Sequence, residues 1–163
     1  INLSFCHRLI VRRNDRGERM QLIPTKELAQ KEFEAFFDEK VPQFNEMEMK
    51  QYGYFIYKQE EPAAFFSLIP VDRHTYWLRS LIMKRNAPVL LPVSIIQTAE
   101  KLTQSFGASS LIIHSKTAVL EQLLTQLGYN LTDQVLEESL QASWWITNLE
   151  YVDKNNGYAQ DSM

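Results

Sequence analysis

The sequence predicts an α/β (α+β) fold in which helices flank a mixed, mainly antiparallel central sheet. Three apolar, strand-forming segments stand in a row, at residues 54–59, 63–71 and 76–83. Two helix-like segments follow, at residues 93–106 and 119–127, and a short apolar strand at 111–114 separates them. Each helix-like segment stops at a glycine, Gly107 or Gly128, where a left-handed helix cap is expected.

The N-terminal residues predict a hairpin. Residues 2–11 alternate with a period of two, which is typical of a half-buried strand. Residues 14–17 read Asn-Asp-Arg-Gly and supply turn chemistry, because glycine tolerates a positive φ. Residues 19–23 can then return as the partner strand.

A first helix is expected after Pro24. Thr25 is placed to cap it, and three phenylalanines, Phe33, Phe36 and Phe37, are spaced for one helical face. Pro42 closes this helix. Residues 42–51 are polar and contain methionine, which predicts a connection or a short second helix.

Short turns separate the three central strands. Glu60-Glu61-Pro62 and Asp72-Arg73-His74 are compact turn signals, so the strands should pair antiparallel as a meander. The helix at 93–106 then makes a crossover, which should be right-handed. Residues 144–149 favour a closing strand, whereas residues 130–141 allow either strand or helix.

The length favours one domain over residues 1–152, with the hairpin at 1–23, a core at 24–149 and a flexible tail at 153–163. The net charge of -3 argues against nucleic acid as a partner. No apolar run approaches the length of a membrane span. The sole cysteine, Cys6, fits a small packed residue and a reducing compartment, and no signal-peptide pattern is seen, so we expect a cytoplasmic protein.

Several other chemistries lack their motifs. No cysteine–histidine cluster has zinc spacing, so no metal is expected. There is no Walker loop and no Gly-x-Ser-x-Gly elbow. The tryptophans lack basic residues between them, which favours core packing over base stacking.

The order of three strands, helix, strand and helix, closed by Leu127-Gly128-Tyr129, resembles the central layout of the GCN5-related N-acetyltransferase (GNAT) superfamily. The resemblance covers residues 20–149, most of the chain. It implies an acyltransferase that moves an acyl group from acetyl-CoA, or another acyl-CoA, to a small-molecule or peptide amine. The sequence does not identify the acceptor.

The turn before the helix at 93–106 departs from the family pattern. In the family this turn holds the CoA pyrophosphate on backbone N–H groups, and glycines allow the close approach. The matching positions here are residues 87–92, in which Leu90 and Pro92 replace the glycines. The resemblance therefore assigns cofactor binding to the residues just before them, which are Met83, Lys84, Arg85 and Asn86. The lysine and arginine can supply charged phosphate contacts, or they are a solvated strand end.

The last helix departs as well. Leu124 holds the place of a family tyrosine that protonates the leaving thiolate, and Thr117 or a neighbour holds the place of an asparagine that contacts the cofactor. Tyr129 matches an aromatic residue that mostly packs.

His114, at the end of a strand near the expected cofactor site, is the candidate catalytic base, because a histidine pKa suits deprotonation of an amine. The alternative is a sheet residue whose hydrogen bonds a neighbour satisfies. Ser80, Ser115 and Tyr76 are within reach of the same site, while His7 and His74 fit a strand face and a turn.

Two classes of function stay open. The chain is a divergent acyltransferase, or it is a non-catalytic relative that acts as a ligand-binding or protein-interaction module. Glu46 and Glu48 lie in the connection that lines the acceptor side in this family, where they attract a cationic amine or are simply solvated. An exposed hairpin or final strand would allow a homodimer.

Overall fold

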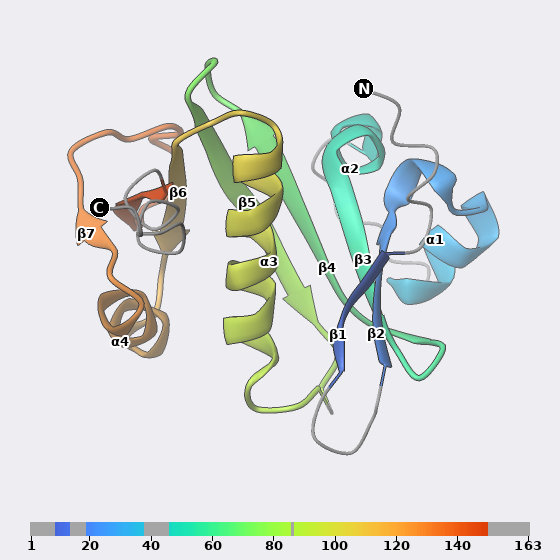
Figure 1. Cartoon of the computed structure of the whole chain (residues 1–163). Helices are drawn as coiled ribbons and strands as arrows, with labels where there is room; N and C mark the ends of the chain where they lie inside the picture. Colours follow the sequence, from blue (N-terminus) through green and yellow to red (C-terminus); the bar gives the residue numbers. More distant parts are fainter. Residues whose placement is uncertain (1–8, 14–18, 38–45, 86, 150–163) are drawn as a thin grey trace, which may run out of the picture. The chain divides into compact units, whose positions relative to one another are not determined.

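The computed structural model describes residues 9–13, 19–37, 46–85 and 87–149. They fall into two compact units. Unit 1 comprises Ile1–Leu68 and Ser80–Val89, and unit 2 comprises Ile69–Arg79 and Leu90–Met163. Figure 1 shows the elements of both. The expectation of one domain over 1–152 stays a prediction, and the tail at 153–163 lies outside the described residues.

Unit 1 contains an antiparallel sheet in the order β1-β2-β3-β4. Its strands are β1 (Leu9–Arg13), β2 (Arg19–Pro24), β3 (Gly53–Lys58) and β4 (Glu61–Pro70). The end of β5 (Thr75–Met83) lies beside β4, since the Ser80 backbone N–H donates to Ser67 Oγ at 3.2 Å. The predicted hairpin and meander are confirmed for the described residues, while residues 2–8 lie outside them.

The turn between β3 and β4 falls one residue earlier than predicted. Lys58 pairs with Glu61, so Gln59 and Glu60 alone form the turn. Their φ angles are 53° and 69°, a conformation that glycine or asparagine adopts more easily. The composition of residues 60–62 indicated a turn but not its register.

Two short helices follow β2. A 3₁₀ turn at Thr25–Glu27 comes first, then α1 (Gln30–Phe36) and α2 (Glu46–Tyr52). The expected cap is wrong: the residue at the N-cap of α1 is Ala29, and the buried Thr25 hydroxyl has no hydrogen-bond partner among the described residues. Thr25 instead begins the 3₁₀ turn, four residues before the N-cap of α1. Residues 42–51 do contain the second helix.

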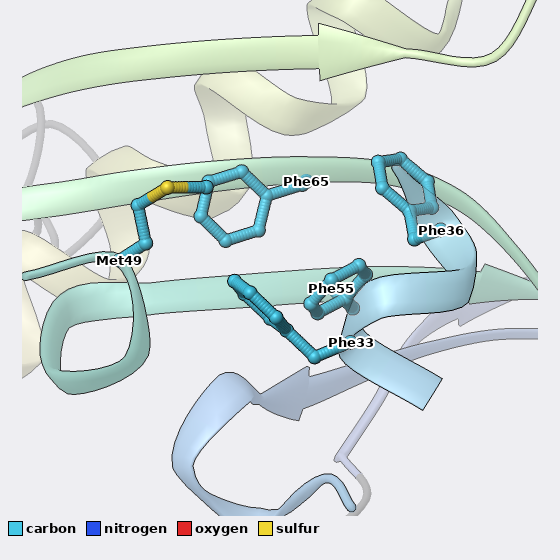
Figure 2. Packing of buried hydrophobic residues seen from close by; sticks show 5 residues of the cluster. All are labelled: Phe33, Phe36, Met49, Phe55 and Phe65. Atoms are coloured by element: carbon cyan, nitrogen blue, oxygen red, sulfur yellow. The ribbon is translucent and has the colours of Figure 1, made fainter. Parts of the chain in front are cut away.

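The core of unit 1 is a cluster of four phenylalanines and a methionine, which we call the Phe cluster: Phe33, Phe36, Met49, Phe55 and Phe65. Figure 2 shows α1 and α2 presenting their apolar side chains to β3 and β4. The rings meet edge to face, with centroids 4.9 Å apart for Phe36 and Phe55. A Cβ on Gly53 would overlap the Met49 carbonyl and the Phe65 ring, so glycine is required there.

Unit 2 contains the strand order β5-β6-β8-β7, in which β6 is Ser110–Ser115, β7 is Asn130–Leu131 and β8 is Ser143–Asn148. The β5 and β6 strands run parallel, joined through α3 (Leu91–Ser105), as the predicted crossover requires. The remaining ladders of this unit, β6/β8 and β7/β8, are antiparallel.

The helices α3 and α4 (Ala118–Gln126) both contact β6. They end at Gly107 and Gly128, whose φ angles are 88° and 92°, so the predicted glycine caps are confirmed. The buried Tyr129 hydroxyl donates to Glu100 Oε2 on α3 at 2.7 Å. Burial raises the pKa of the Glu100 carboxyl, and the tyrosine hydrogen bond opposes that rise.

Residues 130–141, expected as strand or helix, form two strand residues and then an irregular loop over residues 132–142. Leu136 and Leu140 of this loop pack on a buried cluster of Trp77, Ile112 and Trp144. The backbone here is irregular, so the spacing of these two apolar residues does not indicate a helix or a strand. Over the described residues, no helix is long and apolar enough to cross a membrane.

Candidate functional site

The parallel pairing of β5 and β6 stops before the strands do. The ladder runs from Thr75 and Ser110 to Leu78 and Ile113, yet β6 continues to Ser115. His114 and, on β5, Arg79 are the first residues beyond the ladder. Backbone groups past the end of a ladder can bind a ligand in place of a neighbouring strand. The end of this ladder is therefore the first part of the candidate site.

His114 is held by aromatic neighbours. The Trp77 indole N–H donates to its Nδ1 at 3.1 Å, and its ring lies 5.2 Å from that of Trp144. Burial lowers the pKa of His114, the positive charges of Lys116 and Arg79 lower it further, and Glu137 opposes them. The imidazole is therefore neutral with its proton on Nε2. Since the lone pair of Nδ1 already accepts a hydrogen bond, the geometry favours a satisfied sheet residue, and the role of base stays a prediction.

The start of α3 lacks a side-chain cap. Leu90 is the N-cap residue and makes no capping hydrogen bond through its side chain, while Pro92 lies in the first turn and has no N–H. The Leu91 and Val93 N–H groups remain as first-turn donors. Val89 and Leu90 are 91% and 72% exposed, so these apolar side chains are not part of the core. This helix end presents donors and a positive dipole without a polar residue of its own.

The start of α4, in the same unit, is capped. Thr117 Oγ1 accepts from the Leu120 N–H at 3.2 Å, and Ser115 Oγ both donates to the Thr117 carbonyl and accepts from its N–H. The Thr117 hydroxyl therefore caps the helix, and the assignment of Thr117 or a neighbour to a cofactor contact stays a prediction. Leu124 is fully buried, so its position supplies no polar group to a ligand.

The predicted cofactor-binding residues lie at the end of β5 in unit 1. Met83 is 37% exposed, and the Lys84 Nζ lies 4.8 Å from the centre of the Phe36 ring. The Lys84 carbonyl accepts from the Ala87 N–H, which closes a turn around the exposed Arg85. Asn86 lies outside the described residues. The four residues belong to unit 1, whereas His114 belongs to unit 2.

The other sequence candidates have structural partners. The Tyr76 ring lies 5.2 Å from that of Phe106. The His74 N–H donates to Asp72 Oδ1, as expected of a turn residue. Ser80 lies in the sheet as described above. His7 and Cys6 are outside the described residues.

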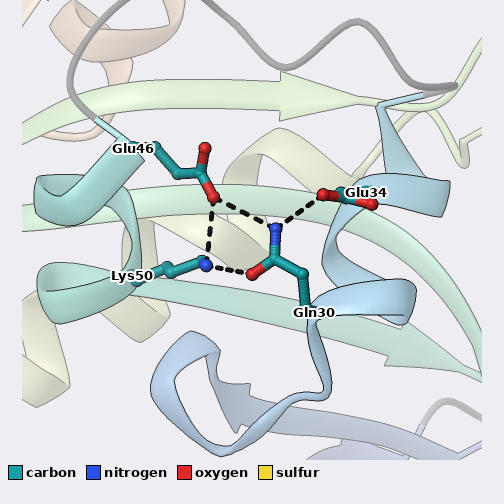
Figure 3. Close-up of polar contacts among 4 residues, drawn as sticks. All are labelled: Gln30, Glu34, Glu46 and Lys50. Carbon is teal, nitrogen blue, oxygen red and sulfur yellow. Dashed lines mark hydrogen bonds and ion pairs between the residues drawn. The ribbon is translucent and has the colours of Figure 1, made fainter.

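Glu46 takes part in a polar network that joins α1 to α2 (Figure 3). It pairs with Lys50 at 3.0 Å, and Gln30 donates to Glu46 and to Glu34 while accepting from Lys50. The hydrogen bonds from Lys50 and Gln30 lower the pKa of the Glu46 carboxyl. This network joins the two helices. It engages the Glu46 carboxylate, for which the sequence left open attraction of an amine or simple solvation.

Two charged residues of unit 2, Arg79 and Glu137, were not among the predicted site residues. Arg79 pairs with Glu137 at 2.9 Å, and its guanidinium carbon lies 5.0 Å from the centre of the Trp77 ring. Arg79 stands two residues after Trp77 on one strand, so the period of two could have placed them on one face. Glu137 lies in the irregular loop, where no periodic signal exists. Over the described residues, no group of three metal-binding side chains is found.

No family model and no curated sequence matches this chain. Solved structures do. N-acetylglutamate synthase from Neisseria gonorrhoeae, complexed with coenzyme A and N-acetyl-glutamate, is similar with a TM-score of 0.65 and 8% identity over 80% of this chain. The chain covers only 35% of that protein. The N-acetyltransferase PseH from Campylobacter jejuni, in complex with acetyl coenzyme A, is similar with a TM-score of 0.57 and 11% identity, over 79% of this chain and 98% of that one.

A GNAT family acetyltransferase from Elizabethkingia anophelis with acetyl-CoA bound is similar with a TM-score of 0.54 and 11% identity, over 67% of this chain and 86% of that one. The chain thus has the acyl-CoA N-acyltransferase-like fold that these acetyltransferases share, and the fold class that its sequence predicted is confirmed. At these identities the likeness defines the fold and not the activity.

Proposed function

We propose that this chain binds an acyl-CoA, such as acetyl-CoA, and transfers the acyl group to an amine. The observation that carries the proposal is the uncapped start of α3, which follows the strand whose parallel ladder with β6 ends early. A helix start without a side-chain cap favours an anion such as a phosphate. Solved structures of the same fold contain coenzyme A or acetyl-CoA.

In this proposal the Leu91 and Val93 N–H groups of unit 2 bind a phosphate of CoA. Met83, Lys84, Arg85 and Asn86 stay the cofactor-binding residues that the sequence predicts. The amine of a small molecule or peptide attacks the thioester carbonyl, so that a C–N bond forms and the C–S bond breaks. The thiolate takes a proton from solvent, because Leu124, at the position where the resemblance expects a tyrosine, has no acidic proton.

His114 is the proposed base that deprotonates the amine. To accept the proton on Nδ1, it has to release the Trp77 N–H. The lowered pKa of His114 keeps it unprotonated at neutral pH but makes it a weaker base. This predicts an activity that rises with pH as more of the amine loses its proton.

Calorimetric titration with acetyl-CoA and CoA tests the proposal, followed by a thiol-release assay with a panel of primary amines. Micromolar binding and amine-dependent thiol release support it. Absence of heat at millimolar ligand overturns it.

Arg85→Ala tests the charged contact that would replace the missing glycine-turn donors. Loss of one exposed guanidinium–phosphate contact should weaken CoA binding about 5–10-fold, and the salt dependence of binding should become shallower. Arg73→Ala is the matched control, since Arg73 is an exposed arginine in the turn after β4. An unchanged affinity in Arg85→Ala would remove this residue from the site.

A non-catalytic ligand-binding or protein-interaction module is the second candidate. The engaged Nδ1 of His114 and the buried Leu124 favour it, because neither position offers a free acid or base. CoA binding without thiol release over the amine panel would select a ligand-binding module. Absence of any CoA binding would leave a module that binds a different ligand or a protein partner.

A further inference from the structure

Unit 2 contains a cation-binding arrangement that the chain fills with its own arginine. The Arg79 guanidinium pairs with Glu137 Oε1 at 2.9 Å and lies over the Trp77 ring, 5.0 Å from its centre. A carboxylate beside an indole face is a strong combination for an organic cation, because charge and ring quadrupole act on the same group. The two charged side chains remain 23% and 32% exposed, so the arrangement can be reached from solvent.

Glu137 and Trp77, the two residues that contact the Arg79 guanidinium, are held in place by contacts other than those to Arg79. Glu137 Oε2 accepts from Ser139 Oγ at 3.1 Å, and the Glu137 carbonyl accepts from the Leu140 N–H. Trp77 is fixed by its hydrogen bond to His114 and by the Trp144 ring at 5.3 Å. A carboxylate and an indole positioned in this way keep their geometry when the cation between them changes.

The loop that carries Glu137 is also held by apolar contacts. Leu136 and Leu140, on either side of Glu137 in the loop, pack on the cluster that contains Trp77. This packing holds the loop on the sheet independently of the ion pair. Loss of the Arg79 side chain would therefore leave a gap beside Trp77 with a negative charge at its edge.

We propose that Glu137 and Trp77 form a binding site for a guanidinium or primary ammonium group of a separate molecule, and that Arg79 acts as an internal competitor for it. Arginine-like ligands fit best, since a planar guanidinium can pair with the carboxylate and stack on the indole at once. An external cation binds by displacing the Arg79 side chain toward solvent. The site needs no CoA, so its test is separate from that of the acyltransferase function.

Tryptophan fluorescence titration without CoA tests this site, with ethylguanidinium as the probe and ethylurea as its uncharged counterpart. Arg79→Ala should bind ethylguanidinium at least about tenfold more tightly than the unaltered chain, because the competitor is gone. Arg79→Lys keeps a cation and should show no such gain. Arg79→Ala combined with Glu137→Gln should lose the gain, and ethylurea should bind none of the variants.

Equal binding of ethylguanidinium and ethylurea to Arg79→Ala would overturn the proposal, as would retention of the gain in the double variant. Absence of saturable binding to the unaltered chain at the highest non-denaturing concentration would also overturn it, because Arg79 would then be a permanent partner. Circular dichroism at each concentration verifies folding. If Arg79→Ala fails to fold, Arg79→Gln keeps most of the side-chain stem and serves the same comparison.

Discussion

The two units have cores of different chemistry. The Phe cluster of unit 1 consists of apolar side chains alone, packed edge to face between short helices and strands. The cluster around Trp77 in unit 2 carries an indole hydrogen bond to His114, and the Arg79–Glu137 ion pair lies over it. The five side chains of the first core carry no hydrogen-bond donor, whereas the second core contains an indole N–H that donates to His114. The second core therefore holds polar side chains next to its aromatic rings, which the Phe cluster does not contain.

The largest expected effect is in the purely apolar core. Phe55 is fully buried and its ring contacts those of Phe33, Phe36, Phe37 and Phe65. Phe55→Ala should lower the free energy of unfolding by about 3–5 kcal/mol, because it leaves a cavity among rings that cannot collapse fully. Urea denaturation measures it. Phe55→Leu should lower the free energy of unfolding markedly less than Phe55→Ala does. An equal loss of unfolding free energy in both variants would show that it does not arise from packing.

A smaller effect should separate the hydrogen bond of the second core from its packing. Trp77→Phe and Trp144→Phe remove the same ring volume from one cluster, but only the first removes the donor to His114. Trp77→Phe should therefore cost about 1 kcal/mol more in unfolding free energy, since a half-buried acceptor loses its partner. Equal losses in urea denaturation would show that the indole N–H contributes nothing to stability.

The smallest effect concerns pH. The pKa of His114 is lowered in the folded protein, mainly by burial, so the unfolded chain binds more protons as pH falls below the ordinary histidine value of 6.5. Stability should be fully present above that value and decline as pH falls toward the folded pKa. The raised pKa of Glu100 acts with the opposite sign, because it favours the folded state at lower pH.

Urea denaturation from pH 5 to pH 8, compared between the unaltered chain and His114→Gln, isolates the histidine contribution. The variant should show a flatter decline below 6.5, the ordinary histidine pKa. His74→Gln, in an exposed turn, is the control. Identical pH profiles for the unaltered chain and His114→Gln would contradict the inference that this imidazole is kept neutral by the fold.

Most elements could be predicted because their signals are local. Gly107 and Gly128 were expected to end two helices, and both have the positive φ that favours glycine. The turn at Gln59 and Glu60 could not be predicted in register, since neither residue type favours positive φ. The pairing of β3 with β4 imposes the positive φ angles on these two residues, although their residue types do not favour them.

The candidate site was predictable only in part. His114 was expected at a strand end, and it lies there. Its hydrogen bond to Trp77 joins residues 37 positions apart and depends on the register of two parallel strands, which no local pattern encodes. The Arg79–Glu137 pair depends in addition on an irregular loop.

The sequence by itself determined the order of strands and helices and the absence of glycine from the turn before α3, because periodicity, glycine caps and residue type are properties of short segments. Only the tertiary structure decided that His114 accepts from an indole and that Arg79 lies between a carboxylate and a ring. These outcomes require side chains from distant segments to meet, and packing brings them together only when the whole unit folds.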